Sequence, residues 1–237
     1  MEGVNALITR QYRVYPPDVI PFLPLVTGAG VETFHKHFRF REFSVEGTEF
    51  TFSGGIVAIS EEELIVVNLV QINSQRIIAE VAGSSTQCTV AFSIMAGYIA
   101  GMDNEHRLIN VEPLLLTHET QCTVKLAFDW QELLSERVAA FLRTSTIERL
   151  TSTQARARLT GLNLRFTVQY EPTDERLREY GISHADKLLV IEPRLNTPES
   201  ERLYFAHSPL DTDTHLDLIK DFEQALMTSA SRRRLRS

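Results

Sequence analysis

The sequence has few cysteines and tryptophans and no long run of apolar residues. Its 237 residues include 2 cysteines and 1 tryptophan. Apolar runs such as residues 64–67 and 114–116 are far shorter than the roughly twenty residues that cross a bilayer, so no membrane contact is expected. Neither cysteine has the close cysteine or histidine neighbours of a zinc site. We therefore expect buried thiols in a reducing compartment and a cytoplasmic protein.

Basic residues are also scarce. Lysine and arginine together number 24 against 31 aspartates and glutamates, which gives a formal net charge of -7. Proteins that bind nucleic acid without sequence preference need a surplus of positive charge, so nucleic acid is an unlikely partner. The chain also lacks the glycine-rich phosphate-binding motifs and the Gly-x-Ser-x-Gly turn of serine hydrolases. These absences argue against catalysis.

What the chain does contain is alternation of apolar and polar residues, which predicts β-strands through most of the first half. Four prolines before residue 25 predict an irregular segment that wraps over the surface. Residues 92–102 fit either a helix or a bulged strand. About eight strands are expected here, a number typical of a barrel or a sandwich. Strands are predicted at residues 34–45, 50–52, 56–59, 64–72, 77–81, 86–90, 108–111 and 120–128.

At residue 129 the apolar period changes from 2 to 3.6 residues, which predicts a helix over residues 130–150. Strands at 162–170, 187–193 and 202–206 follow, and then a helix over 212–227. The expected fold class is therefore α+β, a β-rich N-terminal barrel or sandwich followed by a smaller α+β module. We expect a β-rich domain at residues 1–128, the α+β module at 129–228 and a basic disordered tail at 229–237.

The pentapeptide Thr-Gln-Cys-Thr-Val occurs twice, at residues 86–90 and 120–124, and contains both cysteines. If both copies are strands, Cys88 and Cys122 point inward with the apolar residues around them. The residues flanking the two copies do not match, so two core strands with similar packing are a simpler account than a long repeat. If the strands are neighbours, the two thiols lie close enough to be oxidised to a disulfide.

One predicted strand carries the chemically most suggestive residues. His35, His37, Arg39 and Arg41 lie on one face of it, opposite the phenylalanines, and could bind a phosphate, a carboxylate or an acidic partner surface. On the same strand His35 and His37, with Glu42 after them, have a spacing that suits a divalent metal ion.

The order of residues around this strand resembles the first motif of the cupin family. Gly30 precedes the two histidines and Gly47 follows Glu42, although the Gly-to-His and Glu-to-Gly spacings differ from the family pattern. His106 with Asn110 is similar to the end of the second cupin motif, without its Pro-x-Gly. The resemblance implies a β-barrel metalloprotein with His35, His37 and Glu42 among its ligands.

The leading hypothesis from the sequence is a non-enzymatic binding or assembly subunit that contacts a protein partner or other copies of itself as a homo-oligomer. Strand edges and sheet faces are natural surfaces for such contacts. Two alternatives stay open. One is a small-molecule or metal-binding barrel, either a sensor or a metalloenzyme, that uses the His-x-His strand. The other is nucleotide or RNA binding through the Arg39 and Arg41 face.

Overall fold

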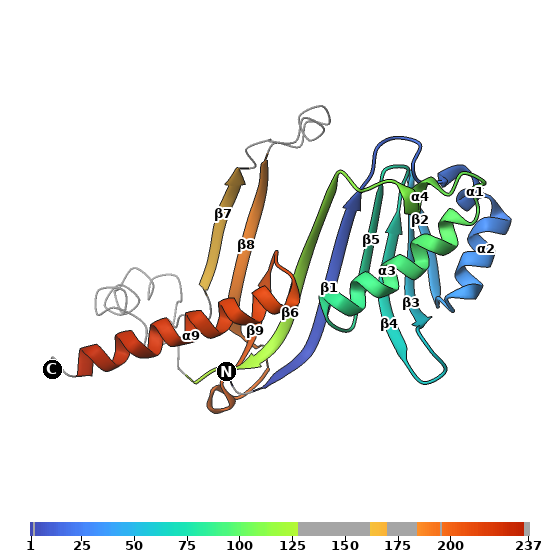
Figure 1. The fold of residues 1–237 in the computed structure, drawn as a ribbon. Helices are drawn as coiled ribbons and strands as arrows, with labels where there is room; N and C mark the ends of the chain where they lie inside the picture. The colour runs from blue at the N-terminus through green and yellow to red at the C-terminus, as the bar shows by residue number, and fades with distance from the viewer. Residues whose placement is uncertain (2, 128–161, 170–183, 195, 235–237) are drawn as a thin grey trace, which may run out of the picture.

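The fold is built on one open antiparallel sheet (Figure 1). The computed structural model describes residues 1, 3–127, 162–169, 184–194 and 196–234. The nine described strands are hydrogen-bonded in the order β2 (Glu42–Glu46), β3 (Glu49–Ala58), β4 (Leu64–Ile72), β5 (Arg76–Val81), β1 (Val4–Val14), β6 (Leu115–Lys125), β9 (Leu203–Ser208), β8 (His184–Pro193) and β7 (Leu162–Gln169).

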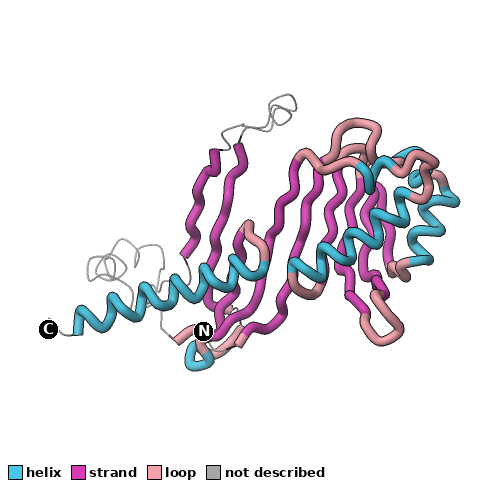
Figure 2. The backbone as a smooth tube through the Cα atoms, viewed as in Figure 1, coloured by secondary structure: helices cyan, strands magenta, loops and turns pink. Residues whose placement is uncertain are grey.

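All described helices pack against the same face of this sheet. Helices α3 (Ser85–Ala100) and α9 (Thr212–Arg234) cross it over the two halves (Figure 2). Helices α1 (Phe22–Val26), α2 (Gly28–His37) and α4 (Arg107–Asn110) cover the β2 end. A short 3-10 turn, η1 (Glu199–Glu201), precedes β9. No described helix lies on the opposite face.

The two halves of the sheet repeat one another about a pseudo-twofold axis between β1 and β6. The order β3, β4, β5, β1 on one side corresponds to β7, β8, β9, β6 on the other, and α3 and α9 follow equivalent strands. The register agrees as well. The pair Thr9 and Val81, between β1 and β5, occupies the position that the pair Thr120 and Ser208 occupies between β6 and β9. Strand β2 has no counterpart among the described strands.

The same symmetry governs the junction of the two long helices. The Ser85 amide donates to the Thr212 hydroxyl at 2.8 Å, and the Thr212 amide donates to the Ser85 hydroxyl at 3.2 Å. Thr9 and Thr120 each donate to a backbone carbonyl in the loop before the corresponding helix, at 2.9 and 2.8 Å. Each helix therefore satisfies a free amide at the start of the other, which fixes both over the centre of the sheet.

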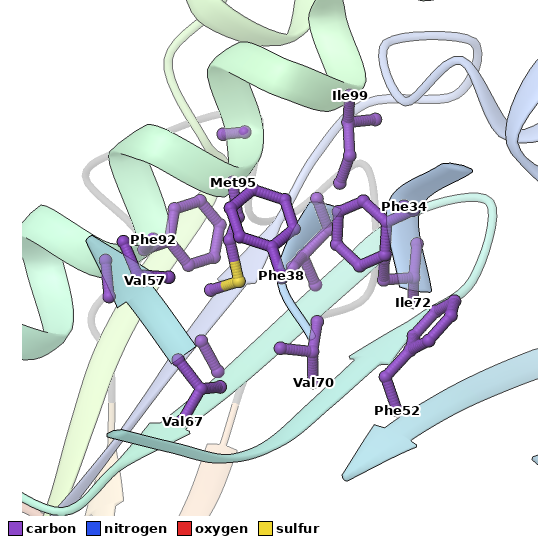
Figure 3. Close-up of a cluster of buried hydrophobic side chains, with 14 of the residues drawn as sticks. Phe34, Phe38, Phe52, Val57, Val67, Val70, Ile72, Phe92, Met95 and Ile99 are labelled. Atoms are coloured by element: carbon purple, nitrogen blue, oxygen red, sulfur yellow. The ribbon is translucent and has the colours of Figure 1, made fainter. Parts of the chain in front are cut away.

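The larger core lies between the first half of the sheet and α2 with α3 (Figure 3). Phe34 is fully buried, and its ring centroid lies 5.0 Å from Phe38 and 4.9 Å from Phe52. A second cluster joins β6, β8 and β9 to α9. Buried aromatic and aliphatic groups of this size supply most of the stability of a fold. The second cluster contains Cys122, Val124, Leu126, Leu189, Ile191, Tyr204, Ala206 and Ile219.

The α+β class predicted from the sequence is confirmed, but the described strands form a single open sheet and not a closed barrel. Strands β4, β5, β7, β8 and β9 lie where alternation predicted them. The expected helix over residues 130–150 lies outside the described residues. Strands β6 and β9 pair directly, so the sheet is continuous across this gap; the division at residue 128 stays a prediction. Among the described residues no helix has the length and apolarity needed to span a membrane.

The prediction for the pentapeptide was wrong for its first copy. Residues 86–90 lie in α3, while residues 120–124 lie in β6. The difference comes from the flanking residues: Ser84 and Gln87 form a capping box, and buried Cys88, Phe92 and Met95 then follow the helical period. The two cysteines are therefore not on neighbouring strands.

The N-terminal segment and the last helix also differ from the sequence prediction. Residues 4–14 form β1 at the centre of the sheet, so the irregular wrap is confined to the proline-containing stretch that follows. Residues 108–111, predicted as a strand, largely belong to α4. Helix α9 continues to Arg234 and so enters the segment expected to be a disordered tail.

Candidate binding groove beside strand β2

An open apolar groove of about 500 Å³ lies between α2 and the edge of the sheet. The α1–α2 corner and α2 form one wall, and the β2–β3 hairpin forms the other. Phe43 and Val45 are 40% and 48% exposed here. Such adjoining exposed apolar side chains are unusual on a surface without a partner. The groove is lined by Val26, Gly28, Val31, Glu32, His35, Phe43, Val45 and Phe50.

The tight corner between α1 and α2 positions the helical wall. Thr27 caps α2 by accepting a hydrogen bond from the Gly30 amide at 3.1 Å. A Cβ on Gly30 would lie 2.3 Å from the carbonyl oxygen of Pro24, so only glycine allows the two helices to approach this closely. Phe34 then anchors α2 to the core, which leaves Val31 and His35 facing the groove.

Strand β2 offers an unpaired backbone edge beside the groove. It is the terminal strand of the described sheet, and all five of its residues are exposed. A two-residue turn closes the β2–β3 hairpin, so Glu46 and Glu49 form a hydrogen-bonded pair across it. Such pairs then recur at every second residue along β2. The amide and carbonyl groups of Phe43 and Val45 therefore point away from β3, toward solvent.

The outer edge of the hairpin is acidic. Glu42 and Glu46 are exposed on the face opposite the groove and form no ion pair within the described ranges. Glu49 pairs instead with Arg76. On the helical wall Lys36 donates to Glu32, and this hydrogen bond holds the pKa of Glu32 below its ordinary value. Two uncompensated carboxylates thus flank the exposed apolar pair.

The structure places His35 and His37 differently from the strand prediction. Both lie in the last turn of α2, and residues two apart on a helix do not share a face. His35 lines the groove, whereas the His37 ring stacks on Tyr98 with 4.3 Å between centroids. Phe34 and Phe38 are one helical turn apart, but alternation allows the same spacing, so the Thr27 cap is the sequence signal that could have indicated α2.

Arg39, Arg41 and Glu42 also fail to share one strand face with the histidines. Arg39 follows the C-cap residue Phe38 of α2 and has the left-handed conformation, with φ of 52°. The stem of Arg41 lies against Gly54, and Glu42 begins β2. The cationic ladder and the strand geometry of the cupin resemblance are therefore absent. Nor do the described residues contain any group of three or more metal-binding side chains.

A polar network occupies the opposite face of the sheet at its centre. Arg10 donates to Glu80 from Nε at 2.9 Å, and the Tyr12 hydroxyl donates to Glu119 at 2.7 Å. Asn68 donates to the second oxygen of Glu80 at 3.2 Å. These residues pair with one another across β4, β5, β1 and β6, so their hydrogen-bonding groups are largely satisfied within the sheet.

A buried Ser-His-Cys cluster lies between β6, β9 and α9. His215 Nδ1 lies 2.7 Å from the Ser208 hydroxyl, and Nε2 lies 3.3 Å from the Cys122 sulfur. Burial raises the pKa of the Cys122 thiol to about 12 and lowers the pKa of His215 to about 4. All three side chains are inaccessible, so the thiol stays protonated and the cluster has a structural role.

Comparison with known proteins gives no family assignment. No family model matches the chain, and no curated protein matches it.

Proposed function

We propose that this protein is a binding subunit that accepts an extended segment of another protein as an added strand beside β2. The observation that carries this proposal is the continuity of the exposed backbone edge with the apolar groove. In β-strand addition, backbone hydrogen bonds give affinity, and side chains on alternate residues give specificity. Here alternate residues of the guest segment enter the groove beside Phe43 and Val45.

The charge of the edge selects the guest. Side chains of an added strand alternate between the two faces of the sheet. Those on the groove face meet Val31, Phe43 and Val45, so they are apolar. Those on the other face meet Glu42 and Glu46, so they are lysine or arginine. The guest is therefore a segment in which apolar and basic residues alternate.

The same charges disfavour a second copy of this chain as the guest. Antiparallel pairing of two β2 strands over their full length centres on Ser44. It places Glu42 of each copy opposite Glu46 of the other. Like charges directly opposite across a ladder are destabilising. A basic guest removes this repulsion and replaces it with two attractive pairs.

Selection from displayed random peptides of about a dozen residues tests the proposal. We expect enriched sequences that alternate apolar and basic residues. Val45→Pro removes an amide that faces solvent while leaving the hydrogen bonds to β3, so it should abolish capture without unfolding the protein. Circular dichroism checks the fold of the variant.

A charge-reversed protein supplies the matched control. Glu42→Lys combined with Glu46→Lys leaves the groove intact and should switch the enriched sequences from basic to acidic. Enrichment of peptides without alternation, or capture that survives Val45→Pro, would refute strand addition. A dimer in analytical ultracentrifugation that dissociates in Val45→Pro would instead identify a second copy as the guest, contrary to the proposal.

A further inference from the structure

A second hollow, of about 360 Å³, lies on the helix-covered face where β1 ends beside α3 and α4. Arg13 projects into it from β1. The guanidinium carbon lies 3.9 Å from the centroid of the Phe92 ring, a cation–π contact. Because stacking uses only the flat face of the guanidinium, the N–H groups in its plane remain available to an acceptor.

Arg13 is only partly satisfied: a side-chain hydrogen bond joins it to Tyr15, which lines the same hollow. The Nε of Arg13 is buried without a hydrogen-bond partner in the part of the chain that the structure describes. No carboxylate of those residues lies within ion-pairing distance of it. Arg10, three residues earlier on the opposite face, is bound to Glu80 through two nitrogens. Buried donors are rarely left unsatisfied unless a ligand or solvent completes them.

The internal symmetry shows that this cation replaces a core residue. Through the registers of the two halves, Arg13 corresponds to Val124, and Phe92 corresponds to Ile219. Val124 and Ile219 are both fully buried in one apolar cluster. The second half therefore fills this position with aliphatic packing, whereas the first half has a charged group facing a hollow. Packing requirements alone do not explain that exchange.

We infer that the hollow binds a small organic carboxylate with an apolar body. The in-plane N–H groups of Arg13 fit the two oxygens of one carboxylate. Apolar side chains such as Ile109, which is 57% exposed, contact the rest of the ligand. Glu112 lines the same hollow, and its negative charge opposes a doubly charged phosphate. The rest of the lining is mixed, with polar Tyr15, Ser93 and Asn110 beside apolar Leu108 and Val111. One negative charge on a small molecule that makes both polar and apolar contacts matches this lining.

Nuclear magnetic resonance of the native protein tests this inference with hexanoate as the probe. The Nε–H signal of Arg13, assigned by its disappearance in Arg13→Lys, should move in a saturable manner on titration. The Arg10 signal should stay unchanged, because Glu80 already accepts its proton. No movement of the Arg13 signal, or equal movement of both signals, would overturn the assignment.

Variants measure the contribution of the charge. Arg13→Gln should weaken hexanoate binding on the order of tenfold or more, because a charge-assisted hydrogen bond is lost. Arg107→Gln removes an exposed positive charge from α4, outside the hollow, and should leave the affinity within about twofold. Unchanged affinity in Arg13→Gln would refute the site. Inorganic phosphate binding more tightly than hexanoate would refute the carboxylate class.

Discussion

Protonation of His215 should make the protein less stable in mild acid. The side chain is fully buried between α9 and the sheet, where Ser208 and Cys122 contact its two nitrogens. Burial, with a smaller contribution from nearby His207, lowers the pKa of His215 to about 4 from the ordinary histidine value of 6.5. Since the folded pKa lies below the unfolded one, the unfolded chain takes up this proton first as the pH falls.

The size of the effect follows from the two pKa values. Above pH 6.5 the imidazole is neutral in both states, and its titration does not affect stability. Between pH 6.5 and 4 the unfolded state is increasingly protonated while the folded state is not. Each unit by which the pH falls then lowers the free energy of unfolding by about 1.4 kcal/mol. The loss is about 2 kcal/mol at pH 5 and about 3 kcal/mol below pH 4, where both states are protonated.

Urea unfolding followed by far-ultraviolet circular dichroism at several pH values measures this loss. Because other groups titrate in the same range, the informative quantity is the difference between the native protein and His215→Gln, which cannot titrate there. We expect the variant to be less stable than the native protein at pH 7. Between pH 7 and pH 5, however, its free energy of unfolding should fall by about 2 kcal/mol less than that of the native protein. Parallel stability curves for the two proteins between pH 7 and 5 would refute a buried neutral imidazole.

Three further predictions concern packing and thiol chemistry. Phe34→Ala should destabilise the fold by about 3–5 kcal/mol in urea, because it removes a fully buried ring among four aromatic neighbours. Gly30→Ala should cost about 1–3 kcal/mol through its clash with α1, while Gly28→Ala, with open space around its Cβ, should change stability by less than about 1 kcal/mol. Cys88 and Cys122 should not react with a thiol reagent until the protein unfolds, since burial raises both pKa values to about 12.

Local sequence predicts the strands that alternate clearly and fails where two periods fit the same residues. Residues 64–72 alternate with one shift after Val67, so that Ile65, Val67, Val70 and Ile72 are buried, and they form β4 as predicted. Phe34, Phe38 and Phe40 satisfy alternation too, yet Phe34 and Phe38 belong to a helical turn. Spacing by four is compatible with both periods, so only the Thr27 cap and the packing of α2 decide between them.

The candidate groove could be predicted only in part. His35 was proposed for a partner site, and it does line the groove, but for a different structural reason. Phe43 and Val45 were predicted only as part of a strand over residues 34–45, because alternation does not reveal whether a strand is central or terminal. That distinction depends on which strands pair at long range, and β2 is exposed because no described strand follows it in the sheet.

The pseudo-twofold symmetry of the sheet separates what the fold requires from what it does not. Equivalent strands, equivalent helix junctions and equivalent buried positions recur in both halves, so packing explains them. The stretch that corresponds to β2, between β6 and β7, lies largely outside the described residues, so the case for β2 rests on its exposed edge and the adjoining groove. Arg13 does depart from the correspondence, because it stands where the other half has Val124. A half-buried cation without an acidic partner reduces stability, and this exchange is therefore a reason to look for a binding function beside Arg13.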